Sequence, residues 1–222
     1  MMFLLGFDVS CLSDHGIPEV LDAMNGNLHR QPLAIELGTG VGFPSIALAK
    51  FLQGGMSDKV CDEHDNSRQP IIVATDTSDI SLALTTSNVH TNGVGKLVTV
   101  TNANHTDVIS LSMLHQQFAP TSSDENDGFD IVFGSSLQSL FDGTSQQNAS
   151  LWKSLDVLLS NENENAIVVL SHVRTGDEKI ELPPVSEGLF ECIHRISGDT
   201  FGMKTRDGHS SDFEVVVLRR RR

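Results

Sequence analysis

The sequence predicts an α/β fold with a doubly wound, mostly parallel seven-stranded sheet that ends in an antiparallel β-hairpin. Three observations predict it. Short apolar runs alternate with segments of helical periodicity through most of the chain. The first apolar run leads directly into a glycine-rich turn and then a helix. The last two apolar runs are separated by a polar loop with no helical pattern, which indicates antiparallel pairing.

The elements follow one another in a regular order. A first helix is expected over residues 17–24, with Pro18 in its first turn and Gly26 at its end. Strands are expected at 33–37, 71–74, 96–100, 129–133, 166–170, 190–196 and 213–218. Further helices are expected at 44–52, 78–90 and 108–118, and along the stripe Leu151, Leu155, Leu158 and Leu159. Five strand–helix units followed by a hairpin give a Rossmann-like layout.

Two details of the helices can be tested. Gly54 and Gly55 are expected to close the helix that begins at residue 44. The helix over 78–90 is expected to have Ile80, Ala83, Leu84 and Ser87 on one face.

The length of 222 residues predicts a single domain, residues 1–222, large enough to bury a substantial core. Residues 1–31 are expected to form only a partial helical lead-in. Residues 54–70 and 119–128 are polar and lack periodicity, so we expect loop insertions there.

The net charge of −14 argues against a nucleic-acid partner and favours a basic peptide or a small molecule. Cys11, Cys61 and Cys192 lie far apart and are odd in number, so we expect no disulfide framework and a reducing, cytoplasmic or nuclear setting. The apolar segment Met1–Phe7 is too short for a signal peptide or a membrane span, so no membrane partner is expected.

Two polar clusters suggest no specific site. Cys61, Asp62, His64 and Asp65 match no standard zinc spacing, and they lack a second ligand pair. A solvated loop without a metal is therefore expected. The run Arg219–Arg222 could be a localisation or docking signal, but a solvated tail is the preferred interpretation.

The glycine turn contains the main functional signal. Gly38, Gly40 and Gly42 follow Glu36, whereas a dinucleotide fingerprint would place a third glycine at Phe43. This spacing favours a cofactor without a pyrophosphate. Asp76, at the end of the second strand, can accept hydrogen bonds from both hydroxyls of a ribose. That role suits NAD and an adenosyl cofactor equally, so Asp76 alone does not discriminate. The layout of five strand–helix units and a hairpin favours the adenosyl cofactor.

With these motifs the chain resembles the class I, seven-β-strand S-adenosylmethionine-dependent methyltransferases. The closer likeness is to the small eukaryotic protein-lysine methyltransferases, a branch that includes nicotinamide-methyltransferase-like proteins. The matching segments are residues 35–45, 73–76 with Asn88 and Asn92, 129–135, and 166–174. The resemblance extends from about Pro32 to Leu218.

The resemblance implies roles for matching residues. The backbone at Gly38, Thr39 and Gly40 would pass along the methionine and ribose parts of S-adenosylmethionine. Glu36 would face its amino-acid portion, Asp76 would hold the ribose hydroxyls, and Ser135 would line the sulfonium side. The alternatives are an ordinary tight turn, a carboxylate at a helix N-terminus, and an ordinary strand-end serine.

Two departures from the family pattern lie after the third and fourth predicted strands. His105 stands in the segment where the family commonly has a tryptophan against the adenine. Residues 136–139 read Ser-Leu-Gln-Ser where the family tends to have Asp-x-x-Tyr near the acceptor amine, with Asp142 as a possible substitute. No catalytic residue is therefore assigned.

The resemblance implies an enzyme, an S-adenosylmethionine-dependent N-methyltransferase that modifies a protein lysine side chain. The substrate would be a protein, with a small-molecule acceptor as a further option. The alternative is a catalytically silent cofactor-binding or interaction module, which residues 136–139 favour. An NAD-dependent oxidoreductase is disfavoured by Phe43 and by the terminal hairpin.

Overall fold

The computed structural model describes residues 17–25, 31–56, 69–118, 128–137, 145–173, 188–197 and 213–221. The helices in this part of the chain are α2 (Ile17–Asn25), α3 (Phe43–Met56), α4 (Asp79–Thr91), α5 (Val108–Phe118) and α6 (Ser145–Leu158). The strands are β1 (Leu33–Leu37), β2 (Ile71–Asp76), β3 (Val98–Asn102), β4 (Ile131–Ser135), β5 (Ile167–Val173), β6 (Phe190–Ser197) and β7 (Phe213–Arg220).

The strands form one seven-stranded sheet in the order β3-β2-β1-β4-β5-β7-β6. The pairs among β1 to β5 are parallel, and β7 runs antiparallel to both β5 and β6. The predicted fold class, including the terminal hairpin, is confirmed. The chain passes outward from β1 to β2 and β3 and then continues at β4 on the other side of β1. The carboxyl ends of β1 and β4 therefore border a topological switch point, where open α/β sheets bind ligands.

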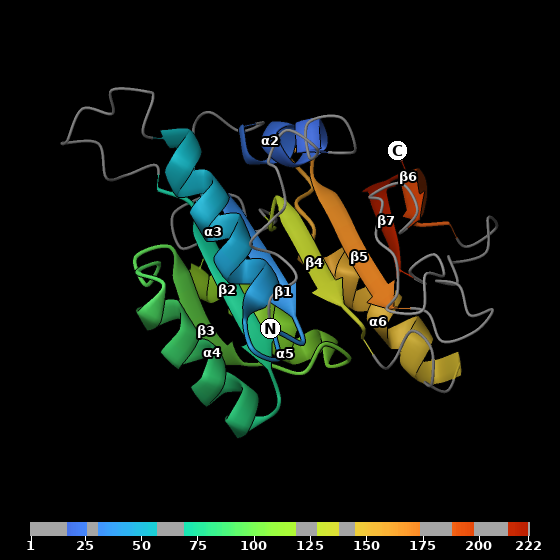
Figure 1. Ribbon diagram of the computed structural model, residues 1–222. Helices are drawn as coiled ribbons and strands as arrows, with labels where there is room; N and C mark the ends of the chain where they lie inside the picture. The colour runs from blue at the N-terminus through green and yellow to red at the C-terminus, as the bar shows by residue number, and fades with distance from the viewer. Residues whose placement is uncertain are drawn as a thin grey trace, which may run out of the picture.

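Helices cover both faces of the sheet (Figure 1). Leu33, Ile35 and Leu37 of β1 belong to the apolar cluster that contains α5 and α6. Ala34 belongs to the cluster that contains α2, α3 and α4. Because side chains alternate along a strand, Glu36 shares the face of Ala34 and lies toward α3.

Several predicted element boundaries are wrong. Helix α3 continues through Gly54 and Gly55 to Met56, so these glycines do not close it. A helix that is already packed on a sheet tolerates an interior glycine at a cost of about 1 kcal/mol. Strand β4 begins at Ile131 rather than at Phe129, which instead forms an isolated bridge with Leu159. This shift makes Ser135 the last residue of β4.

The strand predicted at 96–100 also begins two residues later, as β3 at Val98. The amide of Leu97 donates to the carbonyl of Val94 at 2.9 Å, so a turn occupies the positions just before the strand.

Residues 57–68 and 119–127, which make up most of the two predicted insertions, lie outside the described residues, as does most of the lead-in 1–31. Among the helices that are described, none has the length and apolar character needed to cross a membrane.

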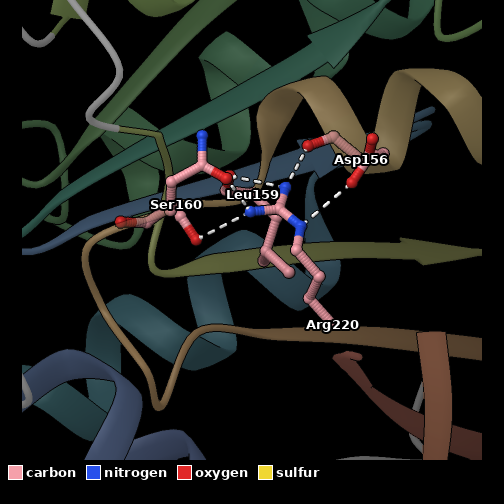
Figure 2. A network of polar contacts seen from close by, with 5 residues as sticks. Asp156, Leu159, Ser160 and Arg220 are labelled. Atoms are coloured by element: carbon pink, nitrogen blue, oxygen red, sulfur yellow. Dashed lines mark hydrogen bonds and ion pairs between the residues drawn. The ribbon is translucent and has the colours of Figure 1, made fainter. Parts of the chain in front are cut away.

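The prediction that the arginine run is a solvated tail is wrong for Arg219 and Arg220, which belong to β7. Figure 2 shows the Arg220 guanidinium at the C-terminal end of α6. Its Nε donates to Asp156 Oδ1 at 2.9 Å, and its two Nη atoms donate to the carbonyls of Leu159 at 3.1 Å and Ser160 at 3.3 Å. A cation here satisfies helix-end carbonyls and complements the negative end of the helix dipole.

Replacing Arg220 with methionine is expected to lower the free energy of unfolding by about 1–2 kcal/mol, because the carbonyls and Asp156 lose their charged donor. Urea unfolding of the variant and the wild type measures this difference. The matched control is Arg221→Met, which changes the exposed neighbouring residue and is expected to alter stability by less than about 0.5 kcal/mol. Equal stability of both variants would contradict the capping role of Arg220.

Candidate functional site

The turn after β1 is built from three glycines with positive φ angles. Gly38, Gly40 and Gly42 have φ values of +66°, +57° and +78°, a region that L side chains rarely adopt. A Cβ at Gly42 would lie 2.6 Å from Thr85 Cγ2, whereas a Cβ at Gly40 would meet no protein atom within 4 Å. The turn is therefore packed against α4 at Gly42 and open at Gly40, where a ligand could approach the backbone.

Glu36 lies beneath this turn and is only 1% exposed. Its Oε2 accepts hydrogen bonds from Thr39 Oγ1 at 2.8 Å, from the Ser45 amide at 3.2 Å and from the Ser45 hydroxyl. Burial raises the pKa of Glu36 to about 7, since the loss of hydration outweighs these hydrogen bonds and the negative charge of Asp76 adds to the effect. All three donors reach the same oxygen, so Oε1 keeps its acceptor capacity.

Glu36 is expected to make the protein less stable as the pH rises from about 5 to about 8. Its native pKa of about 7 lies above the ordinary value of 4.5, so the native state keeps a proton that the unfolded chain has lost. The stabilisation is therefore complete below pH 4.5 and is lost as the pH rises through about 7, at up to about 1.4 kcal/mol for each pH unit. Urea unfolding across this range measures the loss. Glu36→Gln, which cannot titrate, is expected to show a smaller slope, and equal slopes would contradict the assignment.

Asp76 ends β2 and joins the glycine turn to the start of α4. Its Oδ2 accepts the amide of Gly40 at 2.9 Å, and its Oδ1 accepts the amide of Ser78 at 2.9 Å. The N-cap of α4 is Ser78 itself, whose side chain accepts the amide of Ser81. A carboxylate has about four lone-pair positions, so two remain at Asp76 for further donors.

Ser135 lies at the same edge of the sheet, at the end of β4. It is half-buried and pairs with Ser171 of β5. The next residue, Ser136, has a φ of +50°, which is uncommon for a residue with a side chain, and its amide donates to the Ser171 carbonyl at 2.8 Å. Leu137 is then buried against the glycine turn, with its Cδ2 3.0 Å from the position of a Cβ at Gly38. Ser139 and Asp142 lie outside the described residues.

His105 follows β3 and is half-buried. Burial lowers the pKa of His105, because the charged imidazolium loses hydration, while the negative charge of Asp76 acts in the opposite direction. The structure therefore brings His105, Asp76, Ser135 and the glycine turn to one edge of the sheet.

Two residues of this site were not predicted from the sequence. Ser45 lies in the glycine motif without an assigned role, and Thr85 has no motif signal at all. Ile80, Ala83, Leu84 and Ser87 do share one face of α4, but this face is exposed, with Ile80 at 75% and Leu84 at 47%. The buried face is formed by Thr85 and Val89. Helical periodicity selects the more hydrophobic face of α4. The contact with the glycine turn is instead made by Thr85, a small polar residue.

Within the described ranges, no group of three or more His, Cys, Asp or Glu side chains could hold a metal ion. Cys61, Asp62, His64 and Asp65 lie outside these ranges. The described site can therefore offer a ligand two carboxylates, a serine hydroxyl and the backbone of a glycine turn.

No protein-family model matches the sequence, and no curated protein is similar to it in sequence. Solved structures match it in fold. An rRNA methylase from Streptococcus thermophilus aligns with a TM-score of 0.50 and 9% identity, over 93% of this chain and 96% of that one. A candidate sarcosine dimethylglycine methyltransferase from Galdieria sulphuraria aligns with a TM-score of 0.54 and 9% identity, over 94% and 85%.

TrmN from Thermus thermophilus aligns with a TM-score of 0.53 and 15% identity, over 90% of this chain and 48% of that one. The present chain thus spans about half the length of TrmN. At these identities the likeness establishes the fold, a Rossmann-like seven-stranded sheet found in methyltransferases.

Proposed function

We propose that this chain is a single methyltransferase domain that binds S-adenosylmethionine and transfers its methyl group to the side-chain nitrogen of a protein lysine. The glycine turn carries the proposal. It combines three positive-φ glycines, open space at Gly40, and two carboxylates at the carboxyl ends of adjacent parallel strands. Its place beside β4, at the topological switch point, is where this class of sheet binds ligands.

The residues of the site suit this cofactor. Glu36 would attract the cofactor's ammonium group through the oxygen that receives no hydrogen bond from Thr39 or Ser45. Asp76 would use its two remaining acceptor positions for the ribose hydroxyls. The backbone at Gly38, Thr39 and Gly40 would line the cofactor, and Ser135 would border its sulfur side. When bound, S-adenosylmethionine supplies a methyl group on a positively charged sulfur.

The protein's part in the reaction is to hold the acceptor nitrogen in line with the methyl group and to keep water out. Leu137, which is buried against Gly38, contributes an apolar wall next to the turn. A lysine amine must lose its proton before it reacts, and a poorly hydrated site favours that loss.

The choice of a lysine acceptor is supported by charge. The net charge of −14 would attract a basic peptide and repel a nucleic acid. Proteins with this fold include an rRNA methylase and a candidate sarcosine dimethylglycine methyltransferase, so the fold serves acceptors of different kinds.

A second candidate function is a cofactor-binding module without methyltransferase activity. The segment Ser135–Leu137 contains neither a carboxylate nor an aromatic ring to hold an acceptor amine. The experiment is calorimetry of the protein with S-adenosylmethionine, S-adenosylhomocysteine and NADH, followed by transfer of a labelled methyl group into a cell lysate. We expect binding of the first two ligands and a labelled protein band.

The outcomes separate the candidates. A label in RNA or in small molecules would overturn the protein acceptor and retain the methyltransferase. Cofactor binding without any labelled product would favour the silent module. Binding of NADH alone would overturn the cofactor assignment.

A further inference from the structure

The glycine turn has a conformation that its own backbone only partly determines. The amide of Gly42 donates to the carbonyl of Thr39 at 2.8 Å, so residues 39–42 form a β-turn. The first central residue, Gly40, has a positive φ, whereas the second, Val41, does not. This sign pattern is that of a type II′ turn, which needs glycine at the first central position.

Two side chains of α4 hold the carbonyls of this turn. Thr85 Oγ1 donates to the carbonyl of Gly40 at 3.1 Å, and Asn88 Nδ2 donates to the carbonyl of Val41 at 2.9 Å. Both residues lie on one face of α4, because they are three positions apart. They therefore hold two consecutive peptide groups of the turn from the side of α4.

The orientation of a carbonyl determines the orientation of the amide in the same peptide group. Every peptide bond in the described residues is trans, so the C=O and N–H of one peptide group point in opposite directions. With the Gly40 carbonyl turned toward α4, the amide of Val41 points away from that helix. Without Thr85, this peptide group could rotate. Its carbonyl, in place of the Val41 amide, would then point away from α4.

We propose that Thr85 and Asn88 are positioning residues for the cofactor: Thr85 locks the peptide group after Gly40 with the Val41 amide turned away from α4, and Asn88 holds the next peptide group, whose Gly42 amide closes the turn on the Thr39 carbonyl. The inference rests on the proposed function and adds two residues of α4 to the cofactor site. Thr85 also explains Gly42, because the Thr85 side chain occupies the space that a Cβ at residue 42 would need. Thr85 and Gly42 therefore depend on each other.

The test is calorimetric titration of the full chain with S-adenosylhomocysteine for the wild type, Thr85→Val, Thr85→Ser and Asn88→Ala. Thr85→Val keeps the shape of the side chain and removes the donor. If the turn is then in the binding orientation for only a fraction of the time, the Kd rises in inverse proportion to that fraction. We expect a rise of about five- to tenfold for Thr85→Val and Asn88→Ala, and recovery in Thr85→Ser, which keeps the hydroxyl.

Thr86→Val is the matched control, since Thr86 is exposed on the same helix and its hydroxyl donates only to the Leu82 carbonyl of α4 itself. Its Kd is expected to equal that of the wild type. Asn88 is partly exposed, so Asn88→Ala tests the inference even if Thr85→Val fails to fold. A lowered Tm with an unchanged Kd in these variants would overturn the inference and leave the proposed function intact. A wild type that binds no S-adenosylhomocysteine would overturn the proposed function and this inference with it.

Discussion

Asp76→Ala is expected to weaken the binding of S-adenosylhomocysteine about a hundredfold. The substitution removes both acceptor positions proposed for the ribose hydroxyls, and a hydrogen bond to a charged group contributes about 1.5–3 kcal/mol. It also leaves the amide of Gly40 without its acceptor, so the turn loses one of its links to β2, while the bond from the Thr39 amide to the Thr75 carbonyl remains. Isothermal titration calorimetry measures the change in Kd directly.

Asp79→Ala is the control for this experiment. Asp79 is an exposed carboxylate at the first position of α4, three residues beyond Asp76. Its removal changes the net charge by the same amount. It is expected to change the Kd by less than about threefold, because dissolved salt and water screen an exposed charge. Similar Kd values for Asp76→Ala and the wild type would show that the carboxylate of Asp76 does not hold the ribose.

Gly42→Ala is expected to destabilise the protein by about 3 kcal/mol or more. An alanine at a φ of +78° is strained by about 1–2 kcal/mol. The added methyl group would also lie 2.6 Å from Thr85 Cγ2, and Thr85 is fully buried, so forced repacking adds about 1–3 kcal/mol. Denaturant unfolding of the variant and the wild type measures the difference.

Gly54→Ala is the control, and it is expected to change the stability of the protein in the opposite direction. Gly54 lies inside α3, where an added Cβ would meet nothing within 4 Å. Alanine there is expected to increase stability by about 0.5–1 kcal/mol, since it restricts the unfolded chain and favours the helix. A loss of stability in Gly54→Ala, or a neutral Gly42→Ala, would contradict the conformations assigned to these glycines.

The order and type of the strands could be predicted because the buried parallel strands are short apolar runs with clear boundaries. All five residues of β1 are buried, and they stand as one run in the sequence. The two-residue errors at β3 and β4 arose because apolar residues just before a strand can also be buried. Phe129 is an example, since it is fully buried but pairs only with Leu159.

The site could be predicted only as far as its motif extends. Glu36, the three glycines and Asp76 were identified because their spacing along the chain carries the signal. Ser45 and Thr85 were not, because their roles depend on which faces of α3 and α4 meet the turn. Helical periodicity could not reveal that face on α4, since Ile80 and Leu84, two of its most hydrophobic residues, are exposed.

The position of β7 between β5 and β6 has a consequence for biosynthesis. β6 precedes β7 in the sequence, but every pairing of β6 in the sheet is with β7. While the ribosome has not yet released residues 213–220, β6 has no neighbour and the edge of β5 is open. Nascent chains of this length would therefore present an unpaired strand edge, and we expect chaperones that recognise exposed edges to bind at this stage. β7, which is synthesised after β6, thus completes the sheet from a position between β5 and β6.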